Sequence, residues 1–224
     1  MASFSGFITY RNDRVNRLLD LMESDIAEIG INEWSGTLRV YNVAIKICES
    51  EGGSLETIAP AALLHDLGKI DERKEHKPHY VAGEQRKKNL LRRAGYSDQE
   101  IARIVAVIEA HQKKFTPSAV SLEDAILQDA DSIDELGLIG LIRSAIWHSK
   151  RGDPIYFFDS FRKHASGVPE VHKPSRSIVD HQYDKLLALD KFMNTQTGRK
   201  LARRRIMRMN RLMVLLGEEI QAQK

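Results

Sequence analysis

Residues 61–69 read Ala-Ala-Leu-Leu-His-Asp-Leu-Gly-Lys, and this stretch decides the fold. An apolar helical run delivers the adjacent pair His65 and Asp66 just before Gly68, a typical helix stop. A buried histidine–aspartate pair needs a partner, because burying polar groups without one is costly. A divalent metal is suited to this position, since imidazole offers a nitrogen ligand and carboxylate an oxygen ligand. The alternative is a histidine that caps its own helix beside an exposed aspartate.

A second acidic segment repeats this arrangement further along the chain. Asp129 and Asp131 follow the apolar run 125–127, and His79 and His111 lie between the two segments in the sequence. Each histidine alone is typical of an ordinary core or surface position. Together, three histidines and several carboxylates at helix ends predict one polar site within an all-α bundle.

The composition is that of a folded domain without membrane spans. The 224 residues include 34 basic and 31 acidic side chains, and a net charge of +3 requires neither nucleic acid nor an anionic membrane as partner. No apolar run reaches the length of a membrane span, and the N-terminus shows no signal peptide. Cys48 is the one cysteine, which excludes an internal disulfide and fits a reducing, cytoplasmic compartment.

Periodic apolar residues separated by short breaks predict helices and no strands. The expected helices cover residues 13–29, 37–51, about 59–68, 80–94, 97–114, 121–137, a stretch ending at 146, 177–193 and 198–220. An apolar stripe in the last helix, from Ala202 to Ile220, either packs on the core or forms a homodimer contact. A third interpretation of the function is a helical interaction protein that binds a partner through this stripe. The basic run 199–211 is interpreted as a solvated face, without a nucleic-acid partner.

Between Trp34 and Ala202 the chain resembles the HD-domain metal-dependent phosphohydrolases. The resemblance rests on SGTLRVYNVA at 35–44, the stretch 61–69, the spacing of His79 and His111, and LQDADSIDELG at 127–137. The segment MNTQTGRKLARRR at 193–205 also resembles a tail in an uncharacterised bacterial branch of this family. The resemblance implies one all-α HD-type helical domain over 1–224. Its core would lie at about 30–147, followed by an irregular segment at 150–175 and C-terminal helices at 176–221.

The same resemblance implies a metal site. His65 and Asp66 match the doublet that ligates the metal, and Asp131 matches a late aspartate ligand. Asp129 is the fallback for Asp131, since the two alternate in one run. The ion expected is manganese, magnesium, iron, nickel or zinc.

A phosphate substrate is implied as well, with Arg39 and Lys69 as its basic contacts. His79 and His111 serve either a second metal or phosphate binding and proton transfer, and the second interpretation is preferred. Asp66, Lys69 and His111 are the expected catalytic residues. The expected reaction is hydrolysis of a phosphate ester or anhydride, such as cleavage of a nucleoside triphosphate to monophosphate and pyrophosphate.

The chain departs from the family pattern at Gly36. Where the pattern has Ser-His-Thr-Leu-Arg-Val, residues 35–40 read Ser-Gly-Thr-Leu-Arg-Val, and all eight histidines lie at position 65 or later. Glu33 and Asn32 are nearby oxygen donors, which we expect to precede the helix and to point elsewhere. The chain is therefore an inactivated form, an enzyme with a rebuilt site, or a member that binds without cutting. The alternative function is a catalytically impaired nucleotide-binding or regulatory module.

Overall fold

The computed structural model describes residues 8–112, 119, 121–163 and 173–220. These residues form helices joined by turns and contain no strand, which confirms the all-α prediction for the described part of the chain. They divide into two compact units, residues 1–131 and 132–224. The single-domain interpretation of 1–224 stays a prediction.

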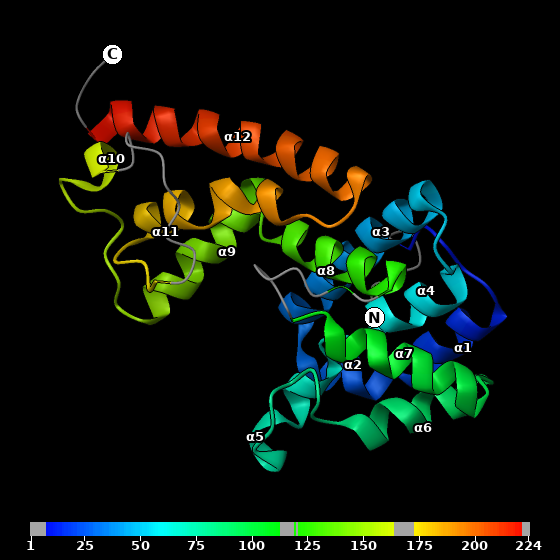
Figure 1. Ribbon diagram of the computed structural model, residues 1–224. Coiled ribbons are helices and arrows are strands. Elements are labelled where there is room, and N and C mark those ends of the chain that lie inside the picture. Colours follow the sequence, from blue (N-terminus) through cyan, green and yellow to red (C-terminus); the bar gives the residue numbers. More distant parts are fainter. Residues whose placement is uncertain (1–7, 113–118, 120, 164–172, 221–224) are drawn as a thin grey trace. The chain divides into compact units, whose positions relative to one another are not determined.

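The first unit is built from successive short and medium helices (Figure 1). They are α1 Asp13–Leu21, α2 Glu23–Ile29, α3 Ile31–Glu51, α4 Leu55–Leu64, the 3-10 turn η2 Leu67–Ile70, α5 Glu72–Glu75, α6 Glu84–Ala94, α7 Asp98–Ala110 and the start of α8 Leu122–Asp134. Ser97 and Glu100 form the capping box that their spacing predicts at the start of α7.

Helix α4 is the central element of this unit. Every residue from Ile58 to Leu64 is buried, and α4 packs against α3 and α7. A helix that is apolar on all sides is stable only when other elements surround it. Pro60 predicts either a helix start near Ala59 or a kink. The start near Ala59 is wrong, because α4 begins at Leu55 and Pro60 lies inside it. The fixed position of α4 determines where His65 and Asp66 emerge.

Helix α3 begins at Ile31, six residues before the predicted start. Gly30 has a φ of 88° and turns the chain between α2 and α3. Trp34 is only 2% exposed, and its burial anchors the first turn of α3 on the core. As a result Glu33 and Gly36 lie inside the helix, one turn apart, and not before it.

Gly68 is required by a close approach of two backbone segments. A Cβ atom built on Gly68 would lie 1.9 Å from the carbonyl oxygen of His79 and 2.5 Å from that of Ala82. Any side chain at position 68 would therefore push the 79–82 segment away from the end of α4. Gly68 thus couples the His65–Asp66 turn to His79.

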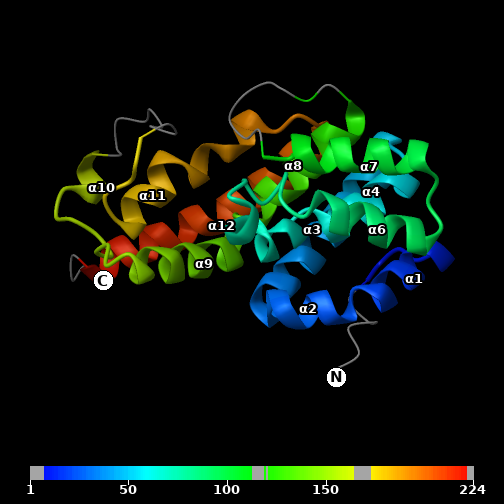
Figure 2. The same ribbon diagram turned by 90° about the horizontal axis from the view of Figure 1, so that it is seen from below.

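The second unit contains the helices after α8. They are α9 Gly137–Lys150, α10 Ser160–Lys163, α11 Ile178–Asp184, the 3-10 segment η4 Leu186–Phe192 and α12 Gln196–Ile220. The apolar stripe of α12 packs against α9 and η4, with Ala202, Ile206, Met209 and Met213 buried (Figures 1 and 2). Intramolecular packing is the interpretation of the stripe that the structure supports, and the homodimer stays a prediction.

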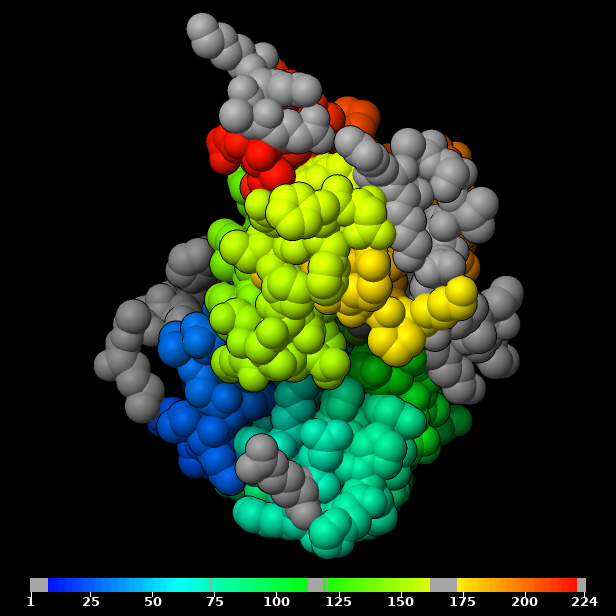
Figure 3. All heavy atoms as spheres, turned by 90° about the vertical axis from the view of Figure 1, so that its left-hand side faces the viewer, coloured from blue at the N-terminus to red at the C-terminus, as the bar shows by residue number. Residues whose placement is uncertain are grey.

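The segment from α9 to α10 covers one face of the second unit (Figure 3). Several large apolar side chains of this segment are exposed, among them Leu138, Ile142, Ile146 and Phe158. Across the described helices of both units, none is long and apolar enough to cross a membrane.

A pair of histidines, the buried His148 and the partly buried His181, lies in the second unit. The rings of His148 and His181 are 5.0 Å apart, and His148 Nδ1 lies 2.9 Å from the carboxylate of Asp153. Burial, with smaller contributions from His148 and Lys185, lowers the pKa of His181 to about 4. His181 is therefore neutral in the folded protein at pH 7.

We expect opposite effects from two glycine substitutions in the first unit. Gly68→Ala should destabilise the protein by about 1–3 kcal/mol, because the added methyl group meets backbone atoms. Gly36→Ala should stabilise it by about 0.5–1 kcal/mol, because Gly36 is helical and its added Cβ would meet only Arg39 Nη2 at 3.5 Å. Urea unfolding followed by circular dichroism measures both changes. Equal effects of the two substitutions would contradict this account of Gly68.

His181 should make stability fall in mild acid. Its pKa in the folded protein is about 4, below the ordinary value of 6.5, so the unfolded chain takes up the proton first as pH falls. The contribution of His181 to the free energy of unfolding is complete above about pH 6.5 and is lost toward pH 4. Between pH 7 and pH 5 the loss amounts to about 1–2 kcal/mol. Unfolding of the wild type and of His181→Asn at the two pH values should show that the variant loses less stability. Identical losses would exclude His181 as the source.

Candidate metal centre

Two histidines occupy equivalent positions at the ends of buried helices. His65 is the C-cap of α4 and His111 the C-cap of α7. The Nδ1 of His65 donates to the Ala62 carbonyl at 2.8 Å, and the Nδ1 of His111 donates to the Ile108 carbonyl. Each ring thereby satisfies a carbonyl of the last helical turn. The bond also fixes the proton on Nδ1 and leaves Nε2 available to a ligand.

Asp66 lies at the centre of the charged groups. Its Oδ2 accepts a hydrogen bond from Lys69 Nζ at 2.8 Å and lies 3.4 Å from His65 Nε2. Its Oδ1 lies 3.5 Å from His79 Nε2. Residues from the end of α4, from η2 and from the segment before α6 therefore converge on one carboxylate.

The electrostatics of the site follow from burial and these contacts. Burial raises the pKa of Asp66, but His65 and Lys69 outweigh burial and hold it well below its usual range. Burial lowers the pKa of His65 and Lys69, and the Asp66 carboxylate more than offsets this, so both pKa values are raised. The site is therefore built around an ionised carboxylate that favours the charged forms of the side chains beside it.

His79 and His111 behave differently from His65. Burial is the largest cause that lowers the pKa of His79, and burial together with the charge of His65 lowers the pKa of His111 to about 4. The amide nitrogen of Gln112 lies 3.0 Å from His79 Nε2 and 2.9 Å from His111 Nε2. The amide group thus connects two neutral imidazole nitrogens, and the sequence analysis did not single out Gln112.

The donor atoms fit a divalent cation. Asp66, His79 and His111 each offer one ligand atom, and these three atoms lie within 4.8 Å of one another. The Nε2 atom of His65 lies 3.4 Å from Asp66 Oδ2. Imidazole nitrogen and carboxylate oxygen together suit first-row divalent metals and magnesium. The geometry leaves open whether His79 and His111 bind the metal or the substrate, so both roles stay predictions.

Two further predicted residues are Asp131 and Arg39. The charge of Asp131 acts on both His65 and His111, whereas Asp129 is not among the main influences on either histidine. This favours Asp131 over Asp129 as a ligand. Arg39 extends back along α3, with its guanidinium 3.4 Å from Ser35 Oγ and close to Gly36.

Glu33 reaches the site, contrary to the expectation that it points elsewhere. Its Oε2 accepts a hydrogen bond from Lys69 Nζ at 2.7 Å. The expectation was wrong because it placed the start of the helix after Glu33, whereas α3 begins at Ile31. Helical spacing between Glu33 and Gly36 is the signal that could have identified this residue.

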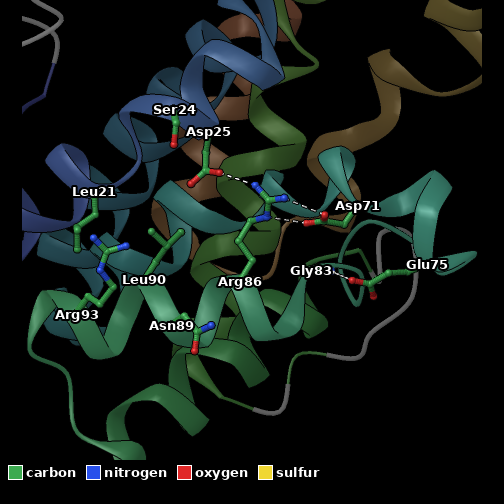
Figure 4. A pocket seen from close by; sticks show the side chains of 10 residues that line it. All are labelled: Leu21, Ser24, Asp25, Asp71, Glu75, Gly83, Arg86, Asn89, Leu90 and Arg93. Atoms are coloured by element: carbon green, nitrogen blue, oxygen red, sulfur yellow. Dashed lines mark hydrogen bonds and ion pairs between the residues drawn. The ribbon is translucent and has the colours of Figure 1, made fainter.

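A separate cavity of about 490 Å³ lies beside α6 and contains none of the predicted site residues (Figure 4). Arg86 spans it and forms ion pairs with Asp25 on α2 and with Asp71, which follows η2. These ion pairs fix the segment after Lys69 against α2. The role of Arg86 is thus to support the site from outside.

The comparisons agree with this fold. Residues 35–136 match the family model of the HD domain, and this range contains His65, Asp66, His79, His111 and Asp131. Over these residues the chain is therefore similar to the HD domain.

Known relatives share the fold over most of their length. The uncharacterized protein YpgQ of Bacillus subtilis (strain 168) is 27% identical over 178 residues, which cover 78% of this chain and 77% of YpgQ. A crystal structure of YpgQ in complex with ADP has a TM-score of 0.70 at 25% identity, covering 92% of this chain and 94% of that chain. An HD-superfamily hydrolase from Bacillus thuringiensis has a TM-score of 0.69 at 25% identity. The match covers 94% of this chain and 96% of that chain. The Lin1889 protein from Listeria innocua is similar in fold, with a TM-score of 0.72 at 23% identity. The match covers 95% of this chain and 100% of that chain.

A divalent metal should raise the melting temperature of this protein. Manganese at a hundredfold excess over its dissociation constant would stabilise the folded state by about 2.7 kcal/mol, which corresponds to several degrees. We expect this shift in the wild type and in His181→Asn, and its loss in His65→Ala and Asp66→Asn. Differential scanning fluorimetry with added manganese and then chelator measures it. A shift that survives in both site variants would place the metal elsewhere.

Proposed function

We propose that this protein is a metal-dependent phosphohydrolase that acts on a phosphate ester or anhydride and that its substrate is a nucleotide. One observation carries the proposal. The ionised carboxylate of Asp66 is surrounded by His65, His79 and Lys69, with His111 close by. A merely structural helix end would not need a carboxylate, imidazoles and an ammonium group in one place.

The residues that would hold the metal are His65, Asp66 and Asp131. His79 and His111 are close enough to Asp66 to join them or to face the substrate. A divalent ion supplies Lewis acidity, which stabilises negative charge on phosphoryl oxygens and lowers the pKa of water. This chemistry is what phosphate hydrolysis at neutral pH requires.

The protein's own side chains would bind and orient the reactants. Asp66 and Asp131 can accept hydrogen bonds from the attacking water and direct its lone pair toward phosphorus. Lys69 lies beside Asp66 and can contact phosphate oxygens, where its charge would offset the negative charge of the transition state. Arg39 offers a planar pair of donors for two phosphate oxygens. His111 would exchange a proton through Nε2, because its Nδ1 is held by the Ile108 carbonyl.

A relative supports the proposal that the substrate is a nucleotide. The YpgQ structure with ADP shows that a protein of this fold binds a nucleoside diphosphate. For the present chain we infer cleavage of a nucleoside triphosphate to monophosphate and pyrophosphate. Such a substrate, together with the buried free thiol of Cys48, fits the cytoplasmic location that the sequence favours.

A second function follows from Gly36. Without the imidazole that the family pattern has at this position, the protein could bind a nucleotide and not hydrolyse it. Arg39, Lys69, His79 and His111 would then form the binding site of a regulatory module. Nucleotide binding that is insensitive to chelator, without product, would favour this alternative.

The test of the proposed function is hydrolysis of a panel of nucleoside triphosphates and diphosphates with manganese present. Chromatography of the nucleotides, with phosphate and pyrophosphate assays, identifies the bond that breaks. We expect turnover by the wild type and a loss of at least about a hundredfold in Asp66→Asn and His65→Ala, since each removes a group that would hold the metal. Lys69→Met should raise KM more than it lowers kcat if Lys69 mainly binds phosphate.

Glu28→Gln is the control, because it removes a carboxylate on α2 that forms ion pairs with Arg86 and Lys74, outside the site. Full activity in both Asp66→Asn and His65→Ala would overturn the assignment of the active site. Tight nucleotide binding without product in the wild type would support the binding module instead.

A further inference from the structure

The side-chain amide of Gln112 lies between two histidines of the candidate metal centre. Its Nε2 atom is 3.0 Å from His79 Nε2 and 2.9 Å from His111 Nε2. Gln112 directly follows the C-cap of α7, whereas His79 belongs to the segment before α6. The amide group therefore joins the end of one helix to a turn that lies 33 residues earlier in the sequence.

The direction of these two hydrogen bonds follows from the tautomers of the rings. The Nδ1 of His111 donates to the Ile108 carbonyl, so Nε2 of the neutral ring carries no hydrogen and can only accept. The Nδ1 of His79 lies 3.6 Å from the Glu72 carboxylate, which favours the proton on Nδ1 in this ring too. An amide nitrogen has two hydrogens and only donates. Gln112 therefore donates one hydrogen to each Nε2.

The position of His79 is fixed by the backbone contacts of its segment. A Cβ atom built on Gly68 would lie 1.9 Å from the His79 carbonyl oxygen, so the turn after α4 lies directly against this segment. Lys87 on α6, which is only 1% exposed, donates from Nζ to the carbonyls of His79 and Tyr80 at 3.3 and 3.1 Å. His79 cannot leave the Gln112 amide without disturbing these contacts.

The amide bonds occupy the atoms that a second metal ion would need. The Nε2 of a neutral imidazole has one lone pair, which accepts a hydrogen bond or binds a metal, but not both at once. The other requirements for such an ion are met. Asp66 Oδ1 lies 3.5 Å from His79 Nε2, and the ligand atoms of Asp66, His79 and His111 lie within 4.8 Å of one another. Asp66 Oδ2 lies nearer His65.

We propose that Gln112 limits the site to a single metal ion by keeping His79 and His111 out of metal coordination. This inference rests on the metal centre of the proposed function, and it deepens that function by assigning the two histidines to the substrate side. A cation shared by both rings must displace both hydrogen bonds. A water or hydroxyl group that donates to one ring displaces only one. Gln112 is thus a positioning residue that acts through the imidazoles.

The number of bound ions tests the inference without substrate or turnover. Cobalt is the probe, because it binds sites of nitrogen and oxygen ligands more tightly than manganese does. Equilibrium dialysis followed by elemental analysis counts the cobalt ions per chain. We expect one ion in the wild type and a second ion in Gln112→Ala. The second ion should bind to this variant at least about tenfold more tightly than to the wild type, because two hydrogen bonds no longer have to be displaced.

Three further variants locate the second ion and control for side effects. Gln112→Ala/His79→Asn lacks one of the two imidazoles and should return to one ion. Gln112→Glu keeps the size of the side chain and adds an oxygen ligand, so it should also bind two ions. Gln99→Ala is the matched control, because Gln99 is exposed in the first turn of the same helix. It should bind one ion, and thermal melts without metal check the folding of each protein.

A second cobalt ion that binds equally well to the wild type and to Gln112→Ala would show that the amide moves aside freely. One ion in the wild type and in both single variants of Gln112 would show that another feature sets the number. A second ion that persists in Gln112→Ala/His79→Asn would place that ion elsewhere. Each of these results overturns the inference and leaves the proposed function. A wild type that binds neither cobalt nor manganese would overturn the proposed function as well.

Discussion

The ionised carboxylate of Asp66, at the end of a helix that is buried on all sides, is the constraint on which the rest of the site depends. Burial disfavours the charge, so the fold must supply compensating cations and donors. His65 and Lys69 do this directly, and their pKa values rise in return. Gly68 is fixed by the same requirement, because only a residue without a side chain lets the backbone of His79 approach this turn.

The part of the site that lies within continuous motifs could be predicted from the sequence. The apolar run 61–64 fixes α4, and helical spacing after Ser97 brings His111 to the end of α7. Both histidines then turn Nε2 outward because each Nδ1 donates to a carbonyl three residues earlier. These features depend on local geometry, which periodicity and capping reveal.

The remaining part depends on tertiary contacts that no local pattern contains. Glu33 was misplaced because the start of α3 is set by the burial of Trp34, not by helix propensity or a side-chain cap. Gln112 reaches two histidines that are far apart in sequence, so its role follows only from the fold. The choice between Asp129 and Asp131 stays a prediction, because it depends on which member of an alternating pair faces His65 and His111.

Gly36, at a position where the resemblance implies a histidine, leaves the helical architecture of α3 intact. The solved relatives cover more than nine-tenths of this chain, so the fold around the site is shared with them.

The most direct test of the metal centre is a crystal structure of the protein grown with manganese, with diffraction recorded at the manganese absorption edge. The account predicts one strong anomalous peak bounded by His65, Asp66 and Asp131. No peak at this position, or a peak only at surface carboxylates, would contradict the metal centre and the hydrolase mechanism built on it.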